Sequence, residues 1–223
     1  MIPRLLIAAF LMTFVADGFA AELCPRTDSN IEWSEQCFQQ RGTLRQVKPE
    51  FVNRLRSGGG ATKLLIVETR ELLAVDPHGR EILSNIAYTG DFDLPNPDGV
   101  GRFSQAAPGK DEGKRQCGYF REKNFTILVP PRFDYCEPFM DGRAQACVDC
   151  VAYCDDEACH RTTLVGGRGV ELDTEGKIRR QFKLPEIKDI CGQADGARIE
   201  KLLNGVAILH CPAKKPGPFD QLK

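Results

Sequence analysis

The sequence predicts a mainly β protein, in which an array of β-hairpin repeats follows a short helical N-terminal arm and is stapled by disulfide bonds. Three observations predict this fold class. Short β-prone segments alternate with turns that contain Gly, Asp or Asn along most of the chain after residue 60. The hairpin-like units recur, with turns that begin about 45 to 52 residues apart, as in repeat architectures. The chain also contains ten cysteines, an even number that favours disulfide bonds in an exported protein.

The composition is that of a globular protein with almost balanced charge. The 223 residues include 30 Lys and Arg and 31 Asp and Glu, so the formal net charge is −1. Such a chain has no basic field to attract nucleic acid, and we expect no nucleic-acid partner. The three histidines leave few candidates for His-based catalysis or for a multi-histidine metal site.

Residues 1–20 have the composition of a secretory signal peptide. Arg4 supplies a positive start, and Leu5–Val15 is an apolar run without charge. This run is too short to span a bilayer, which needs about 20 apolar residues. Gly18 and Ala20 are small residues before a plausible cleavage site. We therefore expect a periplasmic or secreted protein with no stable membrane insertion after cleavage; the alternative is an N-terminal membrane anchor.

Residues 21–60 are expected to form the helical arm and a linker. Trp33, Cys37 and Leu44 lie at roughly helical spacing, with polar residues between them. The Ser-Gly-Gly-Gly segment at 57–60 is a strong breaker of regular structure and predicts the linker.

The β-repeat domain is expected over residues 61–223. Its first strand is expected at 64–67, and three hairpins follow it along the chain. The hairpins are 72–75 with 81–83 around the turn 76–79, 118–120 with 125–129 around the turn 121–124, and 170–172 with 177–182 around the turn 173–176.

A second recurring feature is an Asx-Gly turn followed by a short strand. Asp-Gly and Asn-Gly suit turns that require positive φ. The turns and the strands expected after them are 98–99 with 101–103, 141–142 with 144–147, and 204–205 with 207–210.

The middle unit carries a family resemblance. Residues 118–144 run from Gly-Tyr-Phe through an Ile-Leu-Val-Pro strand and a Phe-Asp-Tyr segment to an Asp-Gly-Arg-Ala turn and strand. This order resembles a WG repeat, whose pattern is Trp-Gly-Tyr-Ile-Asp, a Gly turn, an Ile-Val-Ile-Pro strand, Tyr-Asp, an aromatic residue, an acidic-Gly turn and an Ala-Val strand. Residues 169–178 resemble the start of the next repeat and 73–79 an earlier, degenerate one. The resemblance covers about 64–211.

The sequence also departs from the WG pattern. The signature Trp-Gly is absent, and Cys117-Gly118 and Arg168-Gly169 stand in its place. The Cys147-x-x-Cys150 segment after the Gly-Arg-Ala strand is similar to a subset of bacterial exported WG-repeat proteins. The family implies a β-rich repeat domain that serves as a binding or structural module, without established enzymatic residues to carry over.

All ten cysteines are expected to form disulfide bonds, because export places them in an oxidising compartment. Proximity in the sequence favours the pairs Cys24–Cys37 and Cys191–Cys211, and the other pairings stay open. The disulfide candidates are Cys24, Cys37, Cys117, Cys136, Cys147, Cys150, Cys154, Cys159, Cys191 and Cys211.

The dense cluster between residues 147 and 160 leaves two other interpretations open. Four Cys and His ligands could form a structural zinc site, although their spacing is irregular. A Cys-x-x-Cys pair or a haem-like Cys-His motif could instead support redox chemistry. We favour disulfides that pin a loop, and we expect no cofactor. The candidate ligands are Cys147, Cys150, Cys154, Cys159 and His160.

The sequence contains no recognisable catalytic motif such as a nucleophile elbow, a phosphate loop or a His-Glu-x-x-His zinc site. Exposed aromatic residues often anchor binding surfaces, but most of those here lie in the repeat pattern and are expected in the core. The sequence therefore predicts a non-enzymatic exported binding module whose partner is a protein or an envelope component. The alternative is a metal- or redox-active periplasmic protein that uses the cysteine cluster. The aromatic candidates are Tyr119, Tyr135, Phe139 and Tyr153.

Overall fold

Strands dominate the chain, as the sequence predicts. The computed structural model describes residues 24–25, 31–55, 60–88, 96–107, 114–192, 197–202 and 206–212. The predicted signal peptide, the core of the linker and the Asn204-Gly205 turn lie outside these residues. The elements are β1 (Glu32–Trp33), η2 (Glu35–Cys37), β2 (Phe38–Arg41), β3 (Leu44–Val47), α1 (Pro49–Val52), β4 (Thr62–Ile66), β5 (Glu71–Val75), β6 (Glu81–Ala87), β7 (Val100–Ala106), β8 (Arg115–Arg121), β9 (Thr126–Phe133), β10 (Tyr135–Cys136), β11 (Arg143–Val148), β12 (Val151–Cys154), β13 (Thr162–Val165), β14 (Arg168–Asp173), β15 (Ile178–Lys183), α2 (Ile187–Cys191), β16 (Arg198–Lys201) and β17 (Ala207–His210).

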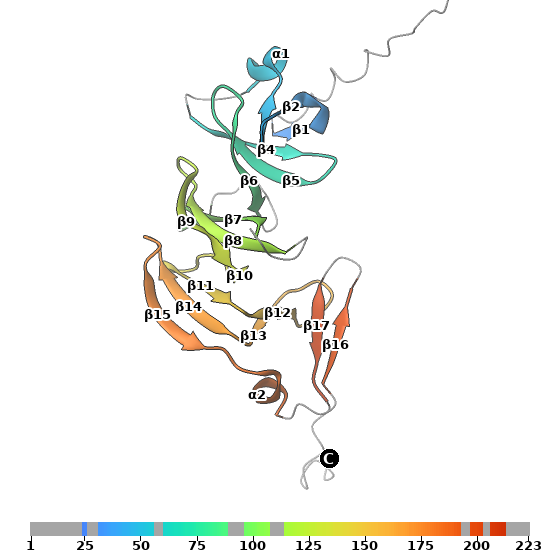
Figure 1. The fold of residues 1–223 in the computed structure, drawn as a ribbon, viewed down its shortest axis with the longest axis vertical. Coiled ribbons are helices and arrows are strands. Elements are labelled where there is room, and N and C mark those ends of the chain that lie inside the picture. The colour runs from blue at the N-terminus through green and yellow to red at the C-terminus, as the bar shows by residue number, and fades with distance from the viewer. Residues whose placement is uncertain are drawn as a thin grey trace, which may run out of the picture.

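The strands form sheets, of which the first and second follow one another along the long axis of the molecule and the third lies beside the second (Figure 1). The first sheet has the order β1-β4-β5-β6-β7-β8-β9, and its strands are antiparallel except for the parallel pair β1 and β4. The second sheet has the order β10-β11-β14-β15 and is antiparallel throughout. The third sheet has the order β13-β12-β17-β16, with β12 parallel to β17. The β2–β3 hairpin lies beside the first sheet.

The three predicted hairpins are confirmed as β5–β6, β8–β9 and β14–β15. The turns of the first and third hairpins share one hydrogen-bonding pattern. In each turn, one aspartate Oδ1 accepts the amides of the residues two and four positions later, at 2.8 and 2.9 Å for Asp76 and at 3.0 and 2.9 Å for Asp173. Gly79 and Gly176 occupy the positive-φ position of these turns. The same local chemistry therefore builds two hairpins almost a hundred residues apart.

Each hairpin turn packs against the preceding hairpin. A Cβ on Gly79 would lie 2.7 Å from Cβ of Val47 in β3, and one on Gly176 would lie 2.8 Å from Cγ2 of Val129 in β9. The turn of the middle hairpin places Phe125 in one cluster with the β6 side chains. Each hairpin turn therefore packs against the hairpin before it, through a glycine in the first and third hairpins and through Phe125 in the middle one.

The strands expected after the Asx-Gly turns are confirmed as β7, β11 and β17. Gly99 and Gly142 have φ of 66° and 78°, as these turns require. β7 pairs with β8, and β11 pairs with β14, so each of these strands joins the hairpin that follows it. The third member, β17, pairs with β16 and with β12 instead.

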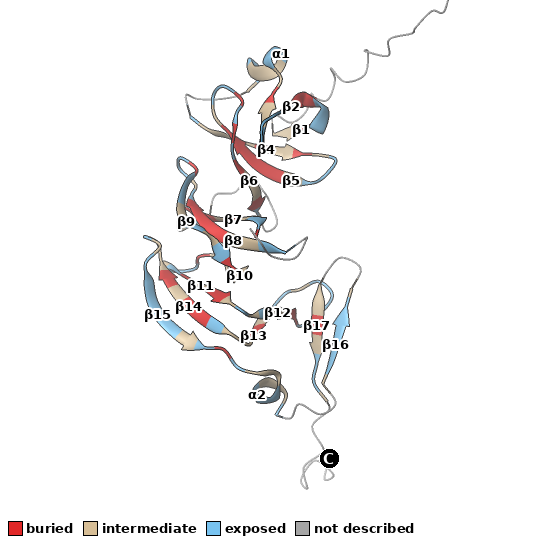
Figure 2. Cartoon of the chain, viewed as in Figure 1, coloured by how far each residue is buried: buried red, intermediate tan, exposed pale blue. Residues whose placement is uncertain are grey.

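The largest core cluster lies between the first and second sheets. Tyr119 is fully buried there, and its ring meets Phe139 edge-on with centroids 5.2 Å apart. The Tyr119 hydroxyl donates to the carbonyls of Glu137 and Gln145 at 2.9 and 3.2 Å, so the buried polar atom is satisfied. Burial of one such side chain stabilises by about 1.5–3 kcal/mol, and this cluster holds the two sheets together. Buried segments concentrate along β5, β8, β11 and β14, whereas β15 and β16 are exposed (Figure 2).

The N-terminal arm is only partly helical. It contains the 3-10 turn η2 and the single-turn α1, but also β1 and the β2–β3 hairpin, which the helical spacing does not predict. Trp33 lies on β1, Cys37 ends η2, and Leu44 is exposed on β3 beyond the hairpin turn, where Gly42 has φ of 64°. The helical spacing of Trp33 and Cys37 does not produce a helix, because these residues lie on a strand and a short turn that pack against the strands of the first sheet. Residues on both sides of the predicted linker thus share one core.

The ten cysteines form five disulfide bonds. Both pairs favoured by sequence proximity are formed, Cys24–Cys37 and Cys191–Cys211. Cys117, which stands where a WG repeat has its Trp, is bonded to Cys136 and ties β8 to β10. Within the described part of the chain, no helix has the length and apolar character needed to cross a membrane.

Candidate functional site

The cysteine cluster between 147 and 160 forms two short disulfide loops. Cys147 is bonded to Cys150, and Cys154 to Cys159. His160 Nδ1 lies 2.7 Å from Asp156 Oδ2, and this hydrogen bond raises the pKa of the imidazole. A disulfide sulfur lacks the thiolate that zinc binds. Among the described residues, no group of three His, Cys, Asp or Glu side chains is arranged to hold a metal ion.

The aromatic candidates lie mainly in the core, as expected. Tyr119, Phe139 and Tyr153 are at most 6% exposed. Tyr135 is partly buried, and its hydroxyl lies 3.2 Å from Thr162 Oγ1. These rings therefore support packing and do not form a binding surface.

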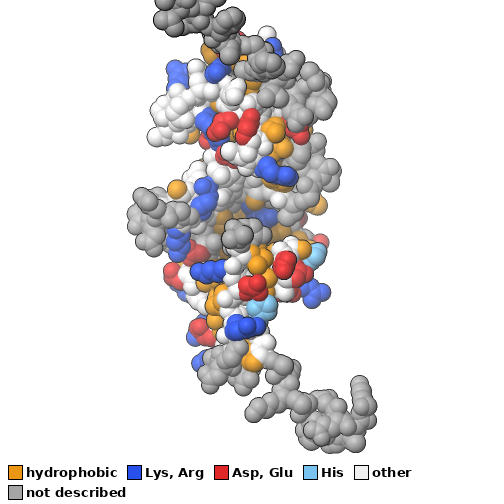
Figure 3. Space-filling view, turned by 90° about the vertical axis from the view of Figure 1, so that its right-hand side faces the viewer, with side chains coloured by type: hydrophobic (Ala, Val, Ile, Leu, Met, Phe, Trp, Pro, Cys, Tyr) orange, Lys and Arg blue, Asp and Glu red, His pale blue; other side chains and the backbone are white. Residues whose placement is uncertain are grey.

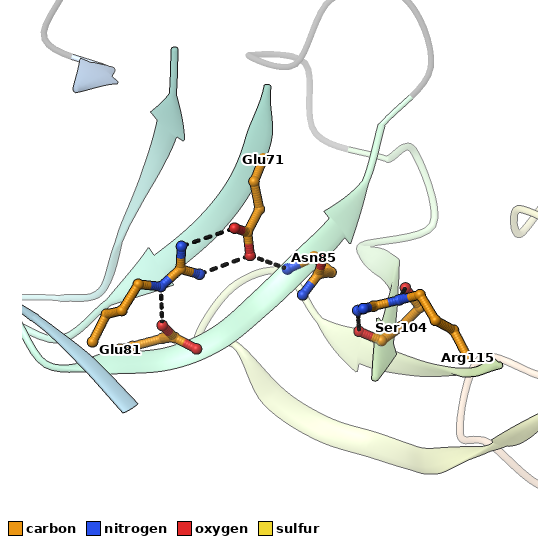
Figure 4. Close-up of polar contacts among 6 residues, drawn as sticks. Glu71, Glu81, Asn85, Ser104 and Arg115 are labelled. Carbon is orange, nitrogen blue, oxygen red and sulfur yellow. Dashed lines mark hydrogen bonds and ion pairs between the residues drawn. The ribbon is translucent and has the colours of Figure 1, made fainter. Parts of the chain in front are cut away.

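The most buried ionic cluster joins the β2–β3 hairpin to β5 and β6. Figure 4 shows Glu71 and Glu81 turned toward one guanidinium, which belongs to Arg45. Arg45 bonds Glu71 through both terminal nitrogens at 2.8 and 2.7 Å, and Glu81 through Nε at 2.8 Å. These bonds outweigh burial and raise the pKa of Arg45. Because every charged group is already paired, the cluster clamps the arm in place and is not a vacant site.

The strongest candidate site is a trench on the outward face of the second sheet. Arg143 lies opposite Asp173, and Gln145 lies opposite Glu171, on neighbouring strands β11 and β14. Residues paired in this way place their side chains on one face. The intervening residues of β11 belong to the core. We define the carboxylate trench by Glu137, Met140, Arg143, Gln145, Glu171 and Asp173.

The trench is hollowed. Two cavities of about 410 Å³ and 260 Å³ lie along it, and both are lined by Arg143 and Glu171. Asp173 and Arg179 line the larger cavity, and Glu137 lines the smaller one. Arg143 therefore marks the point where the two hollows meet.

The charges in the trench are arranged by depth. Glu171 and Asp173 are each 16% exposed, while Arg143 and Arg179 are 71% and 61% exposed. Glu171 Oε1 lies 3.1 Å from Arg143 Nη1, and Asp173 Oδ2 lies 2.6 Å from Arg179 Nε. Burial alone would raise the pKa of Asp173, but amide hydrogen bonds and Arg179 outweigh it and hold this pKa below its usual value. The carboxylates are thus fixed in the floor, and the guanidiniums face solvent.

The end of the trench at the smaller cavity contains a carboxyl group with a raised pKa and an exposed apolar side chain. Burial raises the pKa of Glu137, although the positive charge of Arg102 partly opposes the shift. Met140 beside it is 71% exposed, the highest value among the large hydrophobic side chains of the described residues. The trench therefore offers hydrogen-bond donors, acceptors and one flexible apolar contact. These groups suit the binding of a polar chain, and its lining residues include no nucleophile paired with a base.

No motif in the sequence marks this site, because its residues are ordinary strand residues. Two polar residues two positions apart on β11, and two more on β14, mark a polar sheet face. That alternation was a usable signal, but only the strand register brings Arg143 and Glu171 together. Elsewhere the surface is mixed, and Figure 3 shows acidic and basic side chains interspersed on one face.

Comparison of the chain with models of protein families, with curated proteins and with solved structures finds no match in any of the three.

Proposed function

We propose that this protein is an exported, non-enzymatic binding module of WG-like β-repeats, and that its carboxylate trench holds a protein or an envelope component. The observation that carries the proposal is the depth ordering of the trench, with exposed guanidiniums above fixed carboxylates. Such a surface presents directional donors to carboxylate, amide or hydroxyl groups of a ligand. Hairpins stacked in series supply a rigid support for it.

Export is the second part of the proposal. Five disulfide bonds are consistent with an oxidising compartment. The composition of residues 1–20 supports a cleavable signal peptide, and hence a periplasmic or secreted location. The partner would then be met outside the cytoplasm.

Capture from a cell-envelope fraction tests the function. The mature protein is immobilised beside two charge-reversal variants, Arg143→Glu in the trench and Arg80→Glu as the matched control. Arg80 is an exposed arginine at the β5–β6 turn, in the first sheet and outside the trench. We expect one envelope component to be retained by the wild type and the control and to be lost by Arg143→Glu.

Two results would overturn the proposal. One is recovery of the same components by all three proteins, which would make the trench irrelevant to binding. The other is turnover of a substrate by the mature protein that a single point mutation abolishes.

A further inference from the structure

The last strand of the second sheet, β15, has a free edge. It pairs with β14 on one side, and no described residue pairs with its other side. Five of its six residues are exposed, and the strand stands out as exposed in Figure 2. Exposed edges are usually shortened, interrupted by proline or covered. Among the strands at the other described edges of the three larger sheets, β1 and β10 have two residues each, β9 carries Pro130 and Pro131, and β13 and β16 have four residues each, whereas β15 has six residues and no proline.

The backbone of β15 presents donors to solvent. The Leu184 amide donates to the Gly167 carbonyl at 3.3 Å, next to the end of the strand pair. Amides that point toward the neighbouring strand alternate along an antiparallel strand. Phe182 therefore donates toward β14, and the amides of Gln181 and Lys183 point outward. A second extended chain could accept hydrogen bonds from both.

An apolar groove runs between β15 and the end of β9. Its volume is about 230 Å³, and its apolar lining is Phe133, Val148, Val170 and Ile178. Ile178 is 41% exposed, so its side chain is only half covered by the folded protein. In strand addition, main-chain hydrogen bonds supply affinity and a pocket beside the edge selects alternate side chains. The groove has the position of such a pocket.

The charged side chains around the free edge of β15 determine which net charge a bound segment should carry. Arg132 and Arg168 line the same groove, and within the described part of the chain neither has a carboxylate at ion-pair distance. Lys183 lies opposite Arg168 in the strand register and is 78% exposed, and its one ion pair among the described residues is a long contact of 3.8 Å with Glu186 Oε1. A second copy of β15 would bring its own basic side chains close to Lys183 and Arg168. This pairing is unfavourable, because like charges on paired strands repel. An acidic chain matches them.

We propose that the free edge of β15 accepts an extended acidic segment of a partner protein as an additional strand. One apolar side chain of that segment enters the groove beside Ile178, and its acidic side chains lie near Arg168 and Lys183. The groove shares no lining residue with the carboxylate trench, although Arg179 of β15 lines the trench on the outward face. A failure of either proposal leaves the other standing.

A synthetic peptide of about eight residues with the repeat Val-Thr-Glu-Thr is the probe, because this repeat places Val and Glu on the same face of an extended strand, and the groove, Arg168 and Lys183 also share one face. It is titrated into the isotope-labelled mature protein, and the same peptide with Lys in place of Glu is the charge control. We expect the Glu peptide to shift the amide resonances of residues 178–183 and to slow hydrogen exchange of the Gln181 and Lys183 amides. We expect the Lys peptide to bind at least about tenfold more weakly.

A matched pair of variants tests strand addition itself. Gln181→Pro removes one outward donor and leaves the bonds to β14 in place, while Gln181→Ala removes the side chain and keeps the donor. We expect the proline variant to bind the Glu peptide about five- to tenfold more weakly than the alanine variant. Circular dichroism verifies that both variants are folded.

Several results would overturn the proposal. They are absence of binding at millimolar peptide, equal affinity of the two Gln181 variants, or full displacement of the peptide by hexanoate, which would make the groove a small-carboxylate site. A protein dimer that Gln181→Pro dissociates would assign the edge to a second copy and would overturn it as well.

Discussion

Gly176 lies so close to Val129 that a Cβ added to it would stand 2.8 Å from the valine Cγ2. Gly79 has the same relationship to Val47, at 2.7 Å from its Cβ. Contacts this short leave no room for a side chain. Each turn glycine therefore has two roles. It adopts the positive φ of the turn, and its lack of a side chain lets the turn pack closely against the preceding hairpin.

The close contact between Gly176 and Val129 predicts that adding a methyl group lowers stability more at Gly176 than at a turn glycine without such a contact. Gly176→Ala should lower the free energy of unfolding by about 2–4 kcal/mol, because it adds a clash to the strain of positive φ. Gly42→Ala is the matched control, since Gly42 also has positive φ but has no atom within 4 Å of the added Cβ. It should cost about 1 kcal/mol. Urea denaturation measures both, and equal costs would show that the close contact contributes nothing.

The ion pairs of Arg45 predict that the stability of the N-terminal arm depends strongly on this one side chain. Arg45→Ala leaves Glu81, which is 8% exposed, and Glu71 without their cation. We expect a loss of about 2–4 kcal/mol of stability, because an unpaired carboxylate in a buried site is costly. Arg41→Ala, which removes only one exposed hydrogen bond to Gln46, should cost less than about 1 kcal/mol. Thermal unfolding compares the two variants, and similar melting temperatures would refute the clamp.

Because its pKa is raised, Glu137 should make the free energy of unfolding depend on pH. Its folded pKa is raised by burial, so the folded state holds the proton more tightly than the unfolded state. The favourable contribution is full below the unfolded pKa of about 4.3 and is lost as pH rises through the folded value. Glu137→Gln keeps the neutral form and should be more stable than wild type at pH 7 by less than about 1 kcal/mol, with the difference vanishing below about pH 4. Urea unfolding across this range would contradict the account if the difference were constant.

Local patterns predicted the hairpins because their cause is local. The Asp173 turn is built from hydrogen bonds between residues at most four positions apart, so the sequence alone specifies it. The β14–β15 pair then follows from the polar and apolar residues beside the turn. Proximity in the sequence favoured Cys24–Cys37 and Cys191–Cys211, and both are formed, but proximity alone does not fix the pairing, since Cys191–Cys211 spans 20 positions and Cys147–Cys150 only 3.

Features that depend on distant residues could not be predicted in this way. Trp33 and Cys37 have helical spacing, but β4 and β5 bury them as parts of a strand and a short turn. The trench requires Arg143 to meet Glu171, which lies 28 positions later and reaches it only through the β11–β14 register. A one-residue change of that register would move these side chains to the other face.

We propose that the cysteines stabilise the fold of a binding module and perform no chemistry of their own. Intact-mass measurement with elemental analysis, on protein from its native compartment, tests it most directly. We predict a mass lowered by two hydrogens for each of the five bridges, with no bound metal and no covalent group. Bound zinc, covalent haem, or four free thiols from Cys147, Cys150, Cys154 and Cys159 would contradict the claim and favour a metal- or redox-active protein.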